Sequence, residues 1–115
     1  MPSSPVSNLA GPSTRPIVLL LDILGRRWAM RILWELRDTP CTSRALRRAC
    51  GDASPGVMQT RLDELGQAGF VAKRPGGGYA LTDRGRDLLE SFLPLYAFAE
   101  RWGGPSQDDA HADAG

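Results

Sequence analysis

The polar side chains in the middle of this chain fall into two groups with different chemistry. Arg44, Arg47 and Arg48 stand three and four residues apart, so on a helix they share a face and form a basic patch. Gln59 carries an amide that both donates and accepts hydrogen bonds, as the major-groove edge of adenine requires. Guanidinium groups attract phosphates and amides read base edges, and together they favour contact with double-stranded DNA. A solvated helix face is the alternative explanation for the three arginines alone.

The stretch from Ser43 to Phe70 supplies the elements that hold these side chains. It is predicted to form two short helices joined by a tight turn. The second helix begins with Ser54 as its N-cap and Pro55 at its first position, and Gly69 follows its end. Its apolar stripe, with spacings of four and three residues, consists of Met58, Leu62 and Leu65. This layout is that of a helix-turn-helix, although any small helical domain can contain it.

The face of the second helix opposite its apolar stripe carries mainly short and polar side chains. The residues expected to approach the major groove are Ser54, Pro55, Gly56, Gln59 and Thr60. Arg61 has two candidate roles, a phosphate contact or a brace for Glu64 and neighbouring elements, and the sequence does not decide between them.

A hairpin with a glycine-rich tip follows. Phe70 begins an extended run, residues 75–78 offer a turn with no helical alternative, and residues 79–81 return as a second strand. A helix-turn-helix followed by a hairpin is a winged helix, so the predicted fold class is mainly α with a small β-hairpin (α+β). Lys73 and Arg74, just before the tip, are expected to contact phosphates or to enter the minor groove.

Apolar helices are predicted at both ends of the domain. The first opens at Pro16 and ends at Gly25, and the last is capped by Thr82 and contains Pro94, which can kink it. Both are apolar on more than one face, which is too much surface for one small domain to hide, so we expect them to act as dimerisation helices in a homodimer. The residues assigned to this dimer interface are Ile17, Leu20, Leu21, Leu24, Leu89, Phe92, Leu93, Tyr96 and Trp102.

A further helix is predicted between the first helix and the helix-turn-helix, from Arg27 to Asp38. Trp28 is interpreted as a core anchor of this helix. Residues 39–40 break it, and residues 41–42 offer a short extended bridge to the next helix, which Thr42 or Ser43 can cap.

The length of 115 residues allows one domain. It is predicted to span residues 15–102, between a disordered arm at 1–14 and a disordered acidic tail at 103–115. Residues 15–74 carry 11 basic and 6 acidic side chains, whereas residues 75–115 carry 3 and 7, so the basic body suits a polyanionic partner. The start of the chain does not resemble a secretory signal, and the apolar run at 17–24 is too short to span a membrane. We therefore expect a cytoplasmic protein with no membrane partner.

Catalysis and metal binding are not expected. The one histidine, His111, falls in the predicted tail, so neither a histidine-based triad nor a histidine-rich metal site can be assembled. The three glycines at 76–78 lack the Lys-Ser/Thr sequence and the following helix of a phosphate-binding loop, and no cofactor is expected. Cys41 and Cys50 are interpreted as small buried apolar residues rather than sensors.

The order of these elements, and several short motifs within them, resemble HxlR-type winged helix-turn-helix transcriptional regulators, relatives of the MarR group. The string LDILGRRWAMRILWEL is similar to the opening of that family, and the resemblance covers about residues 17–102. The matching positions are Gly25, Arg27, Trp28, Leu46, Arg47, Arg48, Ser54, Pro55, Arg61, Leu62, Glu64, Leu65, Gly69, Leu81, Thr82, Gly85 and Arg86. The resemblance implies a dimer on promoter DNA, with two recognition helices about one duplex turn apart on a pseudo-palindromic operator.

The chain departs from the family pattern at three points. Gly56 stands where the family commonly has a basic residue, the wing tip is shorter than usual, and no cysteine precedes Cys41, whereas some members sense oxidants through a cysteine near the N-terminus. The first two departures leave open a winged helix kept as a protein-interaction module, with weak or lost DNA binding. A third hypothesis is regulation by a small apolar effector, in a pocket at the dimer interface lined by Trp28, Trp34, Tyr96 and Trp102.

Overall fold

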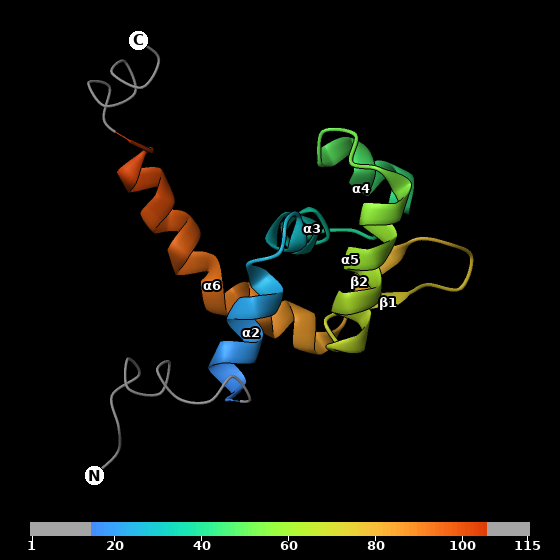
Figure 1. Cartoon of the computed structure of the whole chain (residues 1–115), viewed down its shortest axis with the longest axis horizontal. Helices are drawn as coiled ribbons and strands as arrows, with labels where there is room; N and C mark the ends of the chain where they lie inside the picture. The colour runs from blue at the N-terminus through green and yellow to red at the C-terminus, as the bar shows by residue number, and fades with distance from the viewer. Residues whose placement is uncertain (1–14, 106–115) are drawn as a thin grey trace.

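The computed structural model describes residues 15–105, so the predicted arm at 1–14, most of the predicted tail and His111 lie outside the described residues. Within the described range the chain forms five helices and one hairpin (Figure 1). The elements are α2 (Pro16–Leu24), α3 (Ala29–Glu35), α4 (Ser43–Ala49), α5 (Pro55–Gln67), β1 (Val71–Lys73), β2 (Tyr79–Leu81) and α6 (Asp83–Trp102). This is the predicted winged helix-turn-helix with a flanking helix at each end.

The helix-turn-helix consists of α4 and α5, and both start at side-chain caps. The Thr42 hydroxyl accepts a hydrogen bond from the Ala45 N–H at 3.1 Å, and the Ser54 hydroxyl accepts one from the Val57 N–H at 3.2 Å. Asp52, in the turn between the helices, has a φ of 61°, a conformation that aspartate tolerates better than most residues. The predicted caps are therefore confirmed, with Thr42 as the cap of α4.

The end of α5 leads directly into the wing. Gly69 has a φ of 86°, and the Phe70 N–H donates to the Leu65 carbonyl at 2.9 Å, which closes the helix in a Schellman motif. β1 and β2 then pair antiparallel with Val71 opposite Leu81. The predicted extended bridge before α4 is also present, because Cys41 forms an isolated antiparallel bridge with Tyr79. This bridge joins the first residue of β2 to the segment that leads into the helix-turn-helix.

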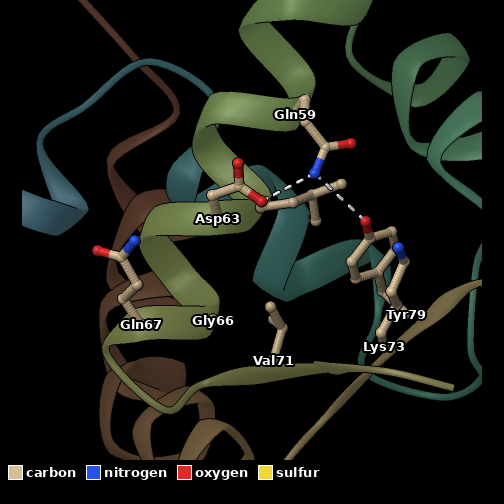
Figure 2. A pocket seen from close by; sticks show the side chains of 8 residues that line it. Gln59, Asp63, Gly66, Gln67, Val71, Lys73 and Tyr79 are labelled. Carbon is tan, nitrogen blue, oxygen red and sulfur yellow. Dashed lines mark hydrogen bonds between the residues drawn. The ribbon is translucent and has the colours of Figure 1, made fainter.

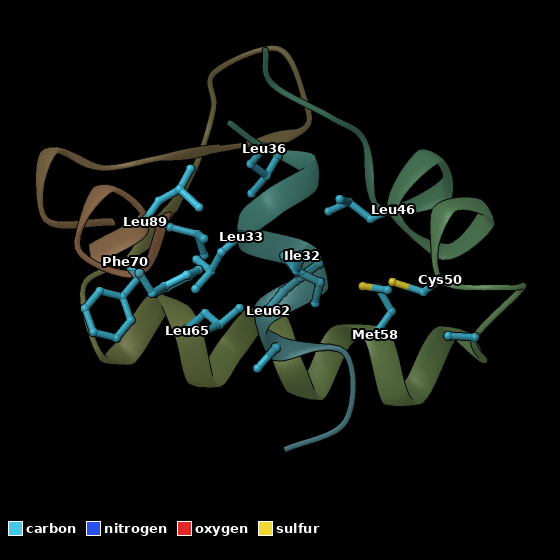
Figure 3. Close-up of a cluster of buried hydrophobic side chains, with 14 residues drawn as sticks. Ile32, Leu33, Leu36, Leu46, Cys50, Met58, Leu62, Leu65, Phe70 and Leu89 are labelled. Carbon is cyan, nitrogen blue, oxygen red and sulfur yellow. The ribbon is translucent and has the colours of Figure 1, made fainter. Parts of the chain in front are cut away.

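The core lies where α3 meets the helix-turn-helix and the first part of α6 (Figure 3). Its largest fully buried side chains are Ile32, Leu33, Leu36, Leu46, Met58, Leu62 and Leu65. The three residues of the predicted α5 stripe are each 1% exposed. Burial of side chains of this size stabilises the fold by about 1.5–3 kcal/mol each, so this stripe sets which face of α5 remains free.

The helix predicted from Arg27 to Asp38 is shorter in the structure, and both of its predicted ends were wrong. Trp28 has a φ of 75° and acts as the N-cap residue, so α3 begins only at Ala29. The chain before it forms a tight turn in which the Ala29 N–H donates to the Arg26 carbonyl at 3.1 Å. Trp28 packs partly buried against the core from this turn rather than from within a helix.

α6 packs against the wing at its start and projects away from the domain at its end (Figure 1). Thr82 caps it by accepting from the Gly85 N–H at 3.0 Å, and the Thr82 hydroxyl donates to the Gly69 carbonyl. Gly85 lies directly against the Phe70 carbonyl, where a Cβ would overlap that oxygen. Pro94 lies inside the helix, which changes direction along its length in Figure 1.

Candidate nucleic-acid interface

One face of α5 is polar and free of contacts with the core. The residues predicted to approach the major groove all lie on exposed positions of this helix or at its cap, and they are Ser54, Pro55, Gly56, Gln59 and Thr60. A Cβ built at Gly56 would meet nothing within 4 Å, so the start of the helix is open. The N-terminal part of a recognition helix is the part that contacts base edges in the major groove.

The Gln59 side chain is held in place rather than free. Its Nε2 donates to Asp63 Oδ1 at 2.8 Å, one helical turn along, and lies 3.5 Å from the Tyr79 hydroxyl of the wing (Figure 2). Gln59 was predicted from the sequence as a site residue, whereas Asp63 and Tyr79 were not. The four-residue spacing of Gln59 and Asp63 could have predicted their contact, because residues four apart share a helix face. The Tyr79 contact joins residues 20 apart in sequence and needed the tertiary structure.

A shallow groove of about 360 Å³ runs between α5 and the wing (Figure 2). Its floor is apolar, with Leu62 1% exposed and Val71 4% exposed, and its rim is polar. Gln59, Asp63, Gln67, Lys73 and Tyr79 are the polar residues that line it. The groove therefore brings one predicted wing residue, Lys73, beside the polar face of the recognition helix.

Arg61 points to the interior side of α5, and its guanidinium is engaged. Nε donates to the Arg27 carbonyl at 2.8 Å, and Nη1 donates to Glu64 Oε1 at 2.9 Å. Glu64 also pairs with Arg26 at 2.6 Å. A hydrogen bond with Asp22 and the charge of Glu64 raise the pKa of Arg26. Of the two roles predicted for Arg61, the structure contains the brace.

The three arginines of α4 are not equivalent. Arg44 and Arg48 are exposed, and both are available to a phosphate. Arg47 is half-buried, because its Nε donates to the Ala53 carbonyl at 2.8 Å and holds the turn before α5. Lys73 and Arg74 of the wing are exposed, and the Arg74 N–H donates to the Gly78 carbonyl at 2.9 Å across the glycine-rich tip.

The outer helices carry most of the exposed apolar surface. Of the eight large apolar side chains exposed within residues 15–105, seven lie on α2 or α6, and the eighth is Val57. α2 is almost entirely apolar and contributes no fully buried residue to the protomer. The seven are Ile17, Leu19, Leu21, Leu93, Leu95, Phe98 and Trp102.

The predicted interface residues divide between this surface and the core. Ile17, Leu21, Leu93 and Trp102 are exposed, whereas Leu20, Leu24 and Tyr96 are partly buried against the core. Leu89 and Phe92 are 5% and 9% exposed, so the protomer already buries them. Sequence reasoning did not assign Leu95 or Phe98 to the interface. Leu95, Phe98 and Trp102 follow one another at spacings of three and four residues, which places all three on one helix face.

The four aromatic residues predicted to line one effector pocket do not gather within a protomer. Trp34 and Tyr96 stack with ring centroids 4.4 Å apart. Trp28 lies under Arg27, 4.6 Å from ring centroid to guanidinium carbon, beside the start of α5, and Trp102 is 61% exposed near the end of α6. A different, open apolar groove of about 210 Å³ lies between α3 and α6, lined by Met30, Leu95, Tyr96 and Ala99.

The surroundings of both cysteines favour the protonated thiol. Burial raises the pKa of the Cys50 thiol, whose residue is 1% exposed. Burial, followed by the charge of Glu35, raises the pKa of the half-buried Cys41 thiol. Because the thiolate is the reactive form, both environments disfavour nucleophilic chemistry.

None of the helices in residues 15–105 has the length and apolar character needed to cross a membrane.

Comparison with known proteins gives consistent matches. The family model for the HxlR-like helix-turn-helix matches residues 23–107. A curated relative, the uncharacterized HTH-type transcriptional regulator YdzF of Bacillus subtilis (strain 168), is 26% identical over 107 residues, which cover 87% of this chain and 98% of the relative.

Solved structures show the same fold. The quinone-bound YodB from B. subtilis matches with a TM-score of 0.68 and 27% identity, covering 74% of this chain and 94% of that one. A protein from Thermoplasma volcanium GSS1 described as a possible HxlR family transcriptional factor matches with a TM-score of 0.68 and 26% identity, covering 76% and 84%. The predicted winged-helix fold class is thus confirmed.

Proposed function

The chain belongs to the HxlR-like helix-turn-helix family, and from this premise we propose that it is a homodimeric transcriptional regulator that binds a pseudo-palindromic promoter operator. The family implies regulation through DNA, and the dimer and the form of the operator are the parts we add. α5 acts as the recognition helix, and the two copies of the hairpin act as wings beside it.

The observation that carries this proposal is the free polar face of α5 between two sets of exposed cations. Arg44 and Arg48 flank it on the α4 side, and Lys73 and Arg74 flank it on the wing side. A duplex carries phosphates on both sides of its major groove, so cations on both sides of a recognition helix fit it. The polar groups between them face the base edges.

The apolar surface of α2 and α6 supports the dimer. A helix that is nearly all apolar and buries no residue fully in its own protomer is unstable in water unless another surface covers it. α6 offers Leu95, Phe98 and Trp102 on one face of its projecting half. A second copy supplies both surfaces at once, and its two-fold symmetry matches a pseudo-palindromic site.

Gel-shift titration with the DNA upstream of its own gene, at several salt concentrations, tests the proposal. We expect two protomers per duplex and an affinity that falls steeply with salt, because each phosphate contact releases a counterion. A folded dimer that leaves every duplex free in dilute buffer would overturn DNA binding and support the protein-interaction alternative.

The groove between α3 and α6 favours a second candidate, control of the dimer by a small apolar effector. Met30, Leu95, Tyr96 and Ala99 line it, and Trp34 stacks on Tyr96 beside it. Titration of tryptophan fluorescence with apolar compounds tests this, with Trp34→Phe as the variant that removes the signal. A titration that leaves the fluorescence of the wild-type protein unchanged while the same compounds release DNA would place the effector elsewhere.

A further inference from the structure

The centre of the recognition helix presents hydrogen-bond acceptors to the outside. Gln59 Nε2 donates to Asp63 Oδ1 at 2.8 Å, and the Tyr79 hydroxyl lies 3.5 Å from the same nitrogen. An ionised carboxylate only accepts hydrogen bonds, so the amide nitrogen, and not the oxygen, must face Asp63. Figure 2 shows the Gln59 carboxamide oxygen on the side away from Asp63. The free polar atom of Gln59 is therefore an acceptor.

Asp63 adds a second acceptor and a negative charge on the same face. Its side chain is exposed, and it forms no ion pair with any residue of the described range 15–105. A carboxylate on a DNA-facing surface repels phosphates, and a hydrogen bond from a base donor offsets that cost. The donors available in the major groove are the exocyclic amino groups of cytosine and adenine.

We propose that Gln59 and Asp63 together read one exocyclic amino group, N4 of cytosine or N6 of adenine, through acceptors alone. This inference rests on the proposed function. Guanine offers only the acceptors N7 and O6 at the same depth, and thymine offers O4 and a methyl group, so neither can be the base of the pair that these acceptors contact. Asp63 is also a positioning residue, because it holds the amide nitrogen that a free glutamine would give to N7 of adenine. The bidentate adenine contact predicted from the sequence, with one donor and one acceptor, is thereby replaced by a contact that uses acceptors alone.

Two measurements test the inference. The first is selection of bound duplexes from a random library, and the second is the affinity for duplexes that carry a base analogue at the selected position. With the wild-type protein we expect one selected base pair in each half-site whose adenine or cytosine amino group is required for binding. Removal of the amino group, with purine for adenine or 2-pyrimidinone for cytosine, should weaken binding about 5- to 10-fold. If adenine is selected, 7-deaza-adenine should leave affinity within about twofold, because N7 is not used.

Asp63→Ala provides the discriminating variant. It frees the Gln59 amide, so selection should narrow to adenine and the complex should become sensitive to 7-deaza-adenine. Asp87→Ala is the matched control, since it removes an exposed carboxylate on α6 that contacts neither Gln59 nor the groove. It should leave the selected sequence unchanged.

The outcomes separate the two proposals. A folded protein that binds no duplex overturns the proposed function and this inference with it. A sequence-specific complex whose affinity is unchanged when each exocyclic amino group of the half-site is removed in turn, or whose selected site is the same for wild type and Asp63→Ala, overturns the inference alone.

Discussion

Arg61 of the recognition helix donates its Nε–H to the main-chain oxygen of Arg27, 2.8 Å away and 34 residues earlier in the chain. Arg27 lies in the turn that joins α2 to α3, and Arg26 of the same turn pairs with Glu64 of α5. These contacts connect the recognition helix to the helix that we assign to the dimer interface. In the proposed dimer, the spacing of the two recognition helices on DNA would depend on this brace.

We therefore expect the main effect of Arg61→Ala to be a lower free energy of unfolding, with a smaller effect on the affinity for DNA. The side chain is 20% exposed, and a hydrogen bond that involves a charged group contributes about 1.5–3 kcal/mol. We expect a loss of that size in urea unfolding followed by circular dichroism. Arg48→Ala, at an exposed position, is the control and should stay within about 0.5 kcal/mol of the wild type. Equal free energies of unfolding for the two variants would show that the Arg61 contacts with Arg27 and Glu64 do not stabilise the fold.

Arg44→Ala and Arg48→Ala should each weaken binding to all sequences alike. Each removes one phosphate contact, so the slope of log affinity against log salt should decrease by about 1. Arg31→Ala is the control for net charge, since Arg31 lies on α3 and forms an exposed pair with Glu35 at 2.9 Å. Gel shifts on an operator and on random DNA measure the effect. A loss confined to the operator would assign these arginines to base recognition instead.

Two glycines should respond in opposite directions to alanine. Gly85→Ala places a Cβ against the Phe70 carbonyl, so it should destabilise the fold by about 1–3 kcal/mol or separate α6 from the wing. Gly56→Ala meets nothing within 4 Å on an exposed helix, so it should stabilise by about 0.4–1 kcal/mol. Thermal unfolding of both variants measures this contrast. A tolerated Gly85→Ala would mean that α6 does not pack against Phe70 in solution.

The buried thiols predict insensitivity to mild oxidants and a loss of stability in alkali. Diamide should leave DNA affinity unchanged at neutral pH, because burial raises the pKa of both thiols and keeps them protonated. Above about pH 9 the unfolded state releases these protons more readily than the folded state does, so stability should fall as pH rises. Unfolding of wild type and Cys50→Ala between pH 7 and 10 measures this, and the variant should lose less. A stability that rises over this range would contradict the burial argument.

Local signals in the sequence were sufficient for most of the fold. Thr42, Ser54 and Thr82 cap helices as predicted, and Gly69 ends α5, because each acts on backbone groups within three or four residues. The wing followed from the turn at 75–78. The α5 stripe also identified the free face of the recognition helix, because apolar spacing decides burial.

Features that depend on distant residues could not be predicted in the same way. The left-handed conformation of Trp28 shortened α3, and no local motif indicated it. Leu89 and Phe92 have the same apolar character as their exposed neighbours on α6, and only contact with α3 assigns them to the core. The Gln59–Tyr79 contact likewise required the wing to fold back on α5.

Sedimentation equilibrium of the purified protein at micromolar concentration, alone and with a selected operator, tests whether two protomers pair and bind one duplex. We expect a dimer, and a complex in which two protomers bind one duplex. Phe98→Glu, which places a charge on the projecting half of α6, should give a monomer with weak DNA binding. A wild-type protein that sediments as a single copy and leaves the duplex free would contradict it.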